Sequence, residues 1–465
     1  MRQKGKFSSA GERITSCSEA RPARLLGAAA VLHLALALMI YTVGKLALLP
    51  GMLNPFGIFV MDGYVYRLEA ISLARLLTRE GIMVWLATAS PFHVKLYSLS
   101  FALFGPLFGF NVLSAEPLNL LYYLAILTTI FMLGREVFDR RTGLLAAGIV
   151  ALWPSFLLHT TQLLRDPLFI FTMLALALIY AKWLRKAYAW RKGLLTGALG
   201  GAVVAVLWSN RSNVWDLVIA ILLLGAGLMI FGQLRQRRAR GGNLLGLSVL
   251  LLLTATVAQV IPESPTHIDQ SLVVALAGDQ DLSRIFARPK ASVPAPAAAA
   301  AEETPTPPLW DRLWTRIKEG RARYVKEYPK AGSNIDTDAQ FQSLGDVIRY
   351  IPRAVVIGFF APFPQMWFQA GDLVGTPGRL LSGMETLVMY GIEALALVGL
   401  WHSRRRLSVW LLVLVASMGL TAFGLVVLNI ATLYRMRYTF WILLIIVGAQ
   451  GARRVFSRLR QRQRT

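Results

Sequence analysis

Apolar runs about as long as a membrane is thick dominate the sequence. One of them, residues 408–430, reads SVWLLVLVASMGLTAFGLVVLNI. A helix that crosses the hydrocarbon core needs about 20 mostly apolar residues. Lipid offers the backbone no hydrogen-bond partners, so spanning segments are helices or strands of a closed barrel. Barrel strands alternate apolar and polar residues, whereas these runs are continuous. We therefore expect an all-α polytopic membrane protein.

The formal net charge is +24, from 49 basic and 25 acidic residues. In a soluble protein such a charge would indicate nucleic-acid binding. Here the basic residues cluster in short segments between the apolar runs, as the positive-inside rule requires of cytoplasmic loops. We therefore expect no nucleic-acid partner. The clearest clusters are residues 135–141, 182–192, 235–240, 404–406 and 453–464.

These clusters predict the topology. Placing them and the basic tail 1–23 in the cytoplasm gives both termini inside. The first run, Leu25–Leu49, is too long for a signal-peptide core and has no cleavage site after it, so we expect an uncleaved anchor. The single cysteine, Cys17, cannot form an intramolecular disulfide. The ten expected spans are residues 25–48, 115–134, 142–158, 167–184, 193–210, 214–232, 243–261, 380–401, 408–430 and 439–452.

Two further apolar segments, 96–112 and 353–370, are short and interrupted by glycine or proline. If either spanned the membrane alone, every later basic cluster would move outside. We therefore expect both to be interfacial or re-entrant on the outer face. Irregular backbone at membrane depth must be buried in protein or line a cavity, so these segments are candidate walls of a site. The alternative is that they are amphipathic packing helices.

This topology divides the chain into a tail, a bundle, a loop and a final set of spans. Residues 24–261 form the N-terminal bundle with an outer loop at 50–114, and residues 380–465 form the last spans and a basic tail. The outer loop 262–379 lies between them. It contains a Pro/Ala-rich stretch, 288–308, which reads as a linker. A basic amphipathic helix that includes Trp310, Leu313, Trp314 and Ile317 follows and is expected on the membrane surface.

Two acids lie just outside predicted spans, Asp62 in MDGYVYRLEAIS and Asp166 in TQLLRDPLFIF. Each has a structural explanation, because acids are common in loops and Asp followed by Pro caps a helix well. The topology nevertheless places both on the outer side. Two carboxylates that meet at a membrane-edge cavity can act as a general base and its orienting partner. Ionisable groups at membrane depth are functional candidates by default.

Several basic residues map to the outer side, against the general trend. Arginine grips phosphate through two parallel hydrogen bonds, so we expect one or two of them to hold a phosphate. Nonspecific contact with lipid headgroups is the alternative. The set is Lys95, Arg211, Arg349, Arg353, Arg379, Arg435 and Arg437.

Other ionisable residues exclude some chemistries. Glu385, near the outer end of a predicted span, could face the cavity, whereas the deeper Glu393 is expected to pair within the bundle. His93 has no partner histidine at metal-ligand spacing. A divalent metal held by Asp62 and Asp166 has no support, so no cofactor is predicted. No glycine-rich nucleotide loop follows a strand, which disfavours a cytosolic nucleotide site.

The order and spacing of several motifs resemble those of the GT-C glycosyltransferases. The most similar members are the protein O-mannosyltransferases and aminoarabinose transferases of glycosyltransferase family 39. An acid with a nearby tyrosine follows the first span, although Asp62-Gly63 stands where Asp-Glu is usual. Phe92-His93 likewise replaces a Pro-Pro pair. The resemblance covers roughly the first 200 residues well. The other matching segments are SPFHVKLYSLSFALFG, GREVFDRRTG, Trp153-Pro154, LLRDPLF and the C-terminal RMRYTFWILL.

The resemblance implies an enzyme of cell-envelope polysaccharide biosynthesis in the bacterial inner membrane. It would transfer a sugar, with inversion, from a polyprenyl-phosphate-linked donor to a glycan, lipid or protein acceptor on the periplasmic side. Asp62 would be the base and Asp166 would orient it or the acceptor. The resemblance implies that Arg211, Arg437, Lys95 and Arg435 stabilise the leaving phosphate, and that Tyr64, Tyr66, His93 and Glu385 contact the sugar or acceptor.

Three other functions fit the same sequence. A flippase or transporter of lipid-linked glycan would show internal repeats and helices broken at mid-membrane, and neither is evident. A lipid-linked polysaccharide polymerase or ligase would rely on outer Arg and His residues. A structural subunit would need no site. Convergence of Asp62, Asp166 and two arginines at the outer surface would favour the transferase, and a continuous path through the bundle would favour transport.

Overall fold

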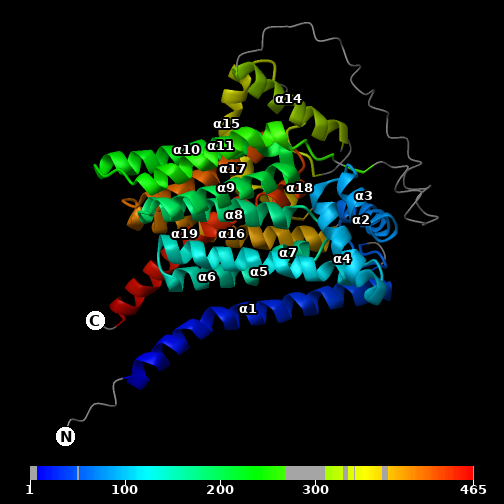
Figure 1. The fold of residues 1–465 in the computed structure, drawn as a ribbon, viewed down its shortest axis with the longest axis horizontal. Coiled ribbons are helices and arrows are strands. Elements are labelled where there is room, and N and C mark those ends of the chain that lie inside the picture. The colour runs from blue at the N-terminus through cyan, green and yellow to red at the C-terminus, as the bar shows by residue number, and fades with distance from the viewer. Residues whose placement is uncertain are drawn as a thin grey trace.

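The computed structural model describes residues 8–49, 52–265, 267–268, 309–327, 333–339, 341–368 and 375–463. The predicted linker 288–308 lies outside these residues. The described residues are almost entirely helical, and their one β-bridge pairs Asn334 with Asn429. Figure 1 shows most of the helices side by side along one axis.

The helices of the described residues are named here in chain order. The elements are α1 (Ser8–Lys45), α2 (Met61–Glu80), α3 (Ile82–Ala87), α4 (Phe92–Phe108), α5 (Val112–Val137), α6 (Arg140–Ala151), α7 (Pro154–Thr160), α8 (Asp166–Arg185), α9 (Trp190–Arg211), η1 (Ser212–Val214), α10 (Trp215–Arg235), α11 (Gly241–Val260), α14 (Leu309–Glu327), α15 (Leu344–Phe360), η2 (Pro364–Met366), α16 (Gly375–Ser403), α17 (Leu407–Val426), α18 (Ile430–Met436) and α19 (Tyr438–Arg462).

Eight apolar stretches among the described residues are long enough to cross a membrane, or nine if the bent pair α6–α7 is one span. One stretch, Trp190–Arg235, contains both α9 and α10. Gly193 and Gly197 of α9 abut Gly242 and Gly246 of α11 in that order, so α9 and α11 run parallel. The intervening α10 must therefore run back as a separate crossing. With that split, the described helices accommodate the ten crossings expected from the sequence.

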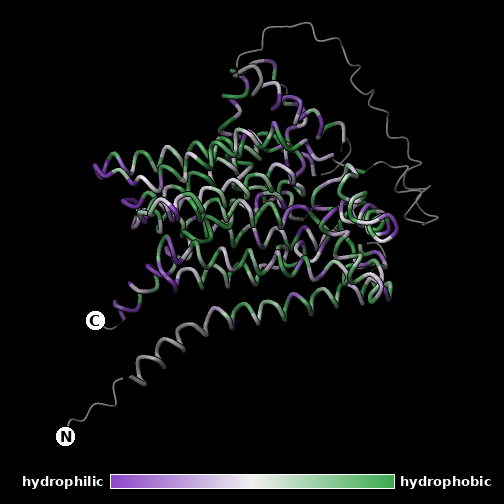
Figure 2. The backbone as a smooth tube through the Cα atoms, viewed as in Figure 1, coloured by the Kyte–Doolittle hydropathy of each residue, from purple (hydrophilic) through white to green (hydrophobic). Residues whose placement is uncertain are grey.

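The two ends of the bundle differ in polarity. The polar ends of α10 and α19 both lie on the left of Figure 2, where the basic residues of 235–240 and 453–462 occur. Helices α2, α3 and α4 lie at the opposite end (Figure 1). The repeated apolar helices make the chain a multi-pass membrane protein. We call the end with α2, α3 and α4 the outer end, after the orientation predicted from the basic clusters. The anchor helix α1 begins at Ser8, well before the predicted span.

The two short apolar segments do not form independent spans. Helix α4 has only 17 residues and packs against α2 and α5. Helix α15 inserts beside the outer end of α17, where Gly358 meets the Leu420 carbonyl and Gly424 meets that of Ala354. Both lie at the end of the bundle that carries α2 and α3.

The amphipathic helix predicted after the linker is α14. Its Trp314 and Ile317 are half-buried, whereas Arg316 and Lys318 are exposed. Arg321 anchors it by donating hydrogen bonds to the carbonyls of Leu425 and Asp336. The helix therefore rests on the outer end of α17.

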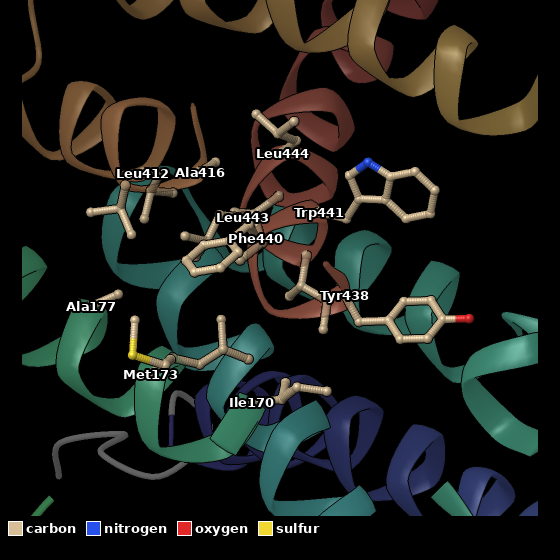
Figure 3. Close-up of a cluster of buried hydrophobic side chains, with 14 of the residues drawn as sticks. Ile170, Met173, Ala177, Leu412, Ala416, Tyr438, Phe440, Trp441, Leu443 and Leu444 are labelled. Carbon is tan, nitrogen blue, oxygen red and sulfur yellow. The ribbon is translucent and has the colours of Figure 1, made fainter. Parts of the chain in front are cut away.

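Helix α8 is the most buried span, with 78% of its apolar window inside the protein. A helix that is apolar on all sides is expected in a core. Ile170, Met173 and Ala177 of α8 face Phe440 and other residues of α17 and α19 in a shared hydrophobic cluster (Figure 3). This packing fixes the position of the first residue of α8, Asp166, relative to the segment that precedes α19.

Close packing of α9 on α11 depends on glycine. A Cβ at Gly197 would lie 2.3 Å from the Gly246 carbonyl oxygen, a backbone atom that cannot rotate away. We expect Gly197→Ala to lower the unfolding free energy by about 1–3 kcal/mol through overpacking. Gly227→Ala is the control, because a Cβ there meets nothing within 4 Å. Thermal unfolding in detergent checks this, and equal midpoints for the two variants would contradict it.

Candidate functional site

Four charged residues that are far apart in the sequence meet at the outer end of the bundle. The Arg435 guanidinium lies between two carboxylates, 2.7 Å from Asp62 through Nη2 and 2.9 Å from Asp166 through Nε. The other oxygen of Asp166 accepts a hydrogen bond of 2.8 Å from Arg211. We call these four residues the charged cluster. Arg435 thus joins the two carboxylates, and Arg211 also holds the carboxylate of Asp166.

Helix ends bring the cluster together. Asp62 lies in the first turn of α2, and Arg211 is the last residue of α9. Asp166 is the first residue of α8 and is followed by a proline. An acid is favoured at the start of a helix, where free N–H groups and the helix dipole stabilise negative charge. Arg435 belongs to the short helix α18, whose N-cap Asn429 accepts a hydrogen bond from the Thr432 amide.

Burial distinguishes the two acids. The Asp166 side chain is 6% exposed, and those of Arg211 and Arg435 are 1% and 12% exposed. Asp62 is 36% exposed and is the only member that an incoming molecule can readily reach. Burial lowers the pKa of Arg435, but the charges of Asp166 and Asp62 outweigh this and raise it overall. Arg435 therefore stays charged and holds both carboxylates in place.

Arg165 is a further charged residue near this site that was not among the residues predicted from the sequence. It precedes Asp166 directly, and its positive charge acts on Asp166, Arg211 and the nearby Tyr66 and His93. With Arg165, the positive charges of three guanidinium groups act on Asp166. The surplus positive charge suits a site that receives an anion. Its position beside an outer acid is the signal that could have identified it.

Tyr66 and His93 form an aromatic wall next to the cluster. Tyr66 lies one turn after Asp62, and its ring meets that of His93 edge-on at 4.4 Å. Burial raises the pKa of Tyr66 and lowers the pKa of His93 well below its usual value. Neither ring nitrogen of the buried His93 has a hydrogen-bond partner among the described residues. A neutral imidazole has one donor and one acceptor nitrogen, and here both are buried and unused.

The depressed pKa of His93 predicts a pH dependence of stability. Because folding lowers this pKa, protonation favours the unfolded chain. The stability contribution is fully present above the unfolded pKa of about 6.5 and is lost as the pH falls below it. We expect His93→Gln to flatten the decline in unfolding temperature between pH 7 and 5. His402→Gln, at an exposed histidine, is the control. An unchanged slope in His93→Gln would contradict this expectation.

A second imidazole reaches the same wall. His267 lies after the end of α11, and its Nδ1 donates a 2.9 Å hydrogen bond to the buried Glu69 carboxylate of α2. Its ring lies 6.4 Å from that of Tyr66, nearly parallel to it. Neither residue could be predicted from the sequence, because only the fold brings the segment after α11 to α2.

Three predicted residues lie outside the charged cluster. The Lys95 amine donates to the Leu86 carbonyl at 2.8 Å and lies 5.6 Å from the Trp85 ring. The Tyr64 ring packs 6.5 Å from Phe56. Arg437 is fully buried, donates to the Ala361 carbonyl and lies against the Trp441 ring. The structure gives no support to a phosphate-binding role for Lys95 or Arg437.

Glu385 is likewise engaged elsewhere. It is 5% exposed, and its carboxylate accepts hydrogen bonds from the Ser155 amide, the Ser155 hydroxyl and the Tyr434 hydroxyl. Because these hydrogen bonds engage the carboxylate inside the bundle, the structure does not support direct contact of Glu385 with a sugar or acceptor. Within the described residues, no three His, Cys, Asp or Glu side chains lie close enough to hold a metal ion.

Comparisons with known proteins give only a distant likeness. No protein-family model matches the sequence, and no curated protein matches it. Two solved structures of an oligosaccharyltransferase from Archaeoglobus fulgidus are similar: AglB with an inhibitory peptide and a dolichol-phosphate, at 13% identity, and the apo form, at 12%. Each match covers 93% of this chain and 51% of the archaeal chain, with a TM-score of 0.43. That score is too low to establish a shared fold.

Proposed function

We propose that the protein is a membrane glycosyltransferase that moves a sugar from a polyprenyl-phosphate-linked donor to an acceptor at the outer face. The observation that carries the proposal is the bridging of Asp62 and Asp166 by Arg435, with Asp62 still 36% exposed. This combination supplies a reachable carboxylate, a buried partner and a surplus of guanidinium groups. Those are the groups that transfer of a glycosyl unit from a phosphate requires.

Asp62 is the general base in this reaction. Its carboxylate takes the proton of an acceptor hydroxyl while that oxygen attacks the anomeric carbon. The bond from the anomeric carbon to the phosphate oxygen breaks on the opposite side, and its electron pair stays with the phosphate. The result is inversion at the anomeric carbon. Asp166 does not touch the acceptor and acts by holding Arg435, which in turn orients Asp62.

The guanidinium groups stabilise the leaving phosphate. Negative charge develops on the phosphate as the glycosidic bond breaks, and fixed positive groups in a site of low water content stabilise it strongly. Arg435, Arg211 and Arg165 all lie around Asp166, so an arriving phosphate would share them with the carboxylates. Arg165 replaces Lys95 and Arg437 in this role.

Tyr66 and His93 contact the sugar in this proposal. The free donor and acceptor of the His93 ring match the hydroxyl groups of a sugar, and a tyrosine ring can pack against its apolar face. Tyr64 stays a prediction without a contact that supports it. The acceptor is a glycan, a lipid or a protein, and we place the chain in a bacterial inner membrane with both termini in the cytoplasm.

The rival functions are favoured less by the site. A transporter needs ionisable groups within a path across the membrane, whereas the charged cluster occupies helix ends at one face. A polymerase or ligase of lipid-linked polysaccharide also acts at that face. The two histidines beside Tyr66 fit such an enzyme, which makes it the second candidate. It differs in releasing a polyprenyl diphosphate and not a monophosphate.

A lipid profile of a deletion strain tests the proposal. We expect a polyprenyl-phosphate monosaccharide to accumulate and a sugar to disappear from the surface glycan, with both reversed by the wild-type gene. Accumulation of a polyprenyl-diphosphate oligosaccharide would favour the polymerase or ligase. Unchanged lipid and glycan profiles would overturn the transferase.

A further inference from the structure

Helix α18, which carries Arg435, is attached to the bundle by a buried group of hydrogen bonds. Glu385 of α16 accepts from the Ser155 amide of α7 at 2.8 Å, from the Ser155 hydroxyl and from the Tyr434 hydroxyl of α18. The Ser155 hydroxyl also contacts the Tyr438 hydroxyl of α19. We call these four residues the Glu385 hub. None is more than 7% exposed.

The hub places a carboxylate where it is costly. Among the described residues, no basic side chain lies within ion-pair distance of Glu385, although the residue lies within the span α16. A buried charge without a cation must be compensated by hydrogen bonds. Hydrophobic packing of four helices would need no such group, so the hub has a purpose beyond filling space.

Helix α18 connects the hub to Arg435, because Tyr434 and Arg435 are neighbours on it. Successive residues of an α-helix project about 100° apart, so the direction of Tyr434 sets the direction of Arg435. Tyr434 points at Glu385 and Arg435 reaches Asp62 and Asp166. A helix of seven residues has too few internal hydrogen bonds to hold its own orientation. External bonds must therefore prevent α18 from rotating.

We propose that the Glu385 hub is a positioning device that aims Arg435. The Tyr434 hydroxyl is the part that acts on α18, and Glu385 and Ser155 hold that hydroxyl in place. The hub touches no substrate. This inference rests on the proposed function and adds to it, because it assigns positioning residues for the phosphate-binding arginine.

Binding of a short isoprenyl phosphate tests the hub without requiring turnover. The full-length protein in detergent is titrated with farnesyl phosphate, a monophosphate with an isoprenoid tail. Tyr434→Phe removes one hydroxyl and keeps the ring. We expect it to weaken binding about tenfold, because a guanidinium shifted by a fraction of an ångström no longer meets the phosphate at hydrogen-bond distance. Tyr180→Phe, at a buried tyrosine that donates to the Leu222 carbonyl, should bind as the wild type does.

A double-mutant cycle separates positioning from packing. Lysine at position 435 keeps the charge on a flexible stem, so it adjusts its own aim. In Arg435→Lys we therefore expect Tyr434→Phe to change binding less than twofold. A tenfold loss in both backgrounds would show that the hub only packs, and wild-type affinity in Tyr434→Phe would also overturn the inference. If Tyr434→Phe does not fold, Ser155→Ala takes its place with the same expected pattern.

The cycle also distinguishes failure of the hub from failure of the function. If the wild-type protein does not bind farnesyl phosphate, the proposed donor class is wrong and the positioning role falls with it. If the wild type binds and the hub variants also bind normally, the proposed function survives and only the hub inference is overturned.

Discussion

Asp62→Asn is expected to reduce sugar transfer by about 10²–10⁴-fold, the range attributed to a positioned general base, while leaving protein level in the membrane unchanged. The amide keeps the shape of the side chain but cannot take a proton. Because Asp62 is 36% exposed, loss of its charge leaves no uncompensated buried group. Transfer measured in membranes, normalised to protein level, checks this.

Asp216→Asn is the matched control for that variant. Asp216 also lies in the first turn of a helix, at the end of α10 that is predicted to be outside. It also pairs with an arginine, Arg316, at 2.7 Å. It is 45% exposed and is not part of the charged cluster. We expect normal transfer from Asp216→Asn. Normal transfer from Asp62→Asn as well would show that Asp62 is not the base.

Arg435→Met is expected to damage both stability and transfer. It leaves the buried Asp166 with only Arg211 and leaves Asp62 without its partner. Breaking a buried ion pair by removing one member costs about 3 kcal/mol or more, which should appear as a lower unfolding temperature in detergent. Loss of a phosphate-stabilising group should also reduce transfer by at least about 10²-fold in the protein that remains folded.

Arg316→Met is the control for the ion-pair effect. Its side chain is 61% exposed, and exposed pairs contribute less than about 1 kcal/mol. We expect only a small change in its unfolding temperature. If Arg435→Met and Arg316→Met unfolded at similar temperatures, the bridge between the two carboxylates would not be a structural element of the site.

The helical class of the fold and the positions of the helix ends could be predicted from the sequence because they depend on composition over long windows. Basic clusters and apolar runs placed the helix ends, and helix ends placed Asp62, Asp166, Arg211 and Arg435 on one face. The same count of membrane crossings predicted that segments 96–112 and 353–370 do not span the membrane alone. These inferences need only the alternation of inside and outside.

The choice among the outer arginines could not be predicted in this way. Arg435 and Arg437 are two residues apart, yet one meets two carboxylates and the other is directed at the Ala361 carbonyl. Residues two positions apart on a helix project about 200° apart, so the two side chains leave in nearly opposite directions, and only the fold shows which direction meets the carboxylates. Lys95 is predicted on the same face, but its amine donates a hydrogen bond to the nearby Leu86 carbonyl.

Pairings between distant segments were also hidden. Asp62 and Arg435 lie 373 positions apart, and the contact between Glu69 and His267 joins α2 to the end of α11. The charge of Glu385 and its position near the end of a predicted span are those expected of a cavity residue. Its neighbours Ser155 and Tyr434 nevertheless supply enough donors to engage it inside the bundle. Such local saturation depends on side-chain geometry and leaves no pattern in the sequence.

Consumption of the accumulated lipid by purified protein tests the central claim most directly. Lipid extracted from the deletion strain is incubated with the wild-type protein, with Asp62→Asn and with Asp216→Asn, in the presence of a membrane extract that supplies the acceptor. Mass spectrometry follows the polyprenyl-phosphate sugar. We predict that the wild type and Asp216→Asn convert it to free polyprenyl phosphate and that Asp62→Asn leaves it intact. Equal consumption by all three proteins, or by none, would contradict a transferase built on the charged cluster.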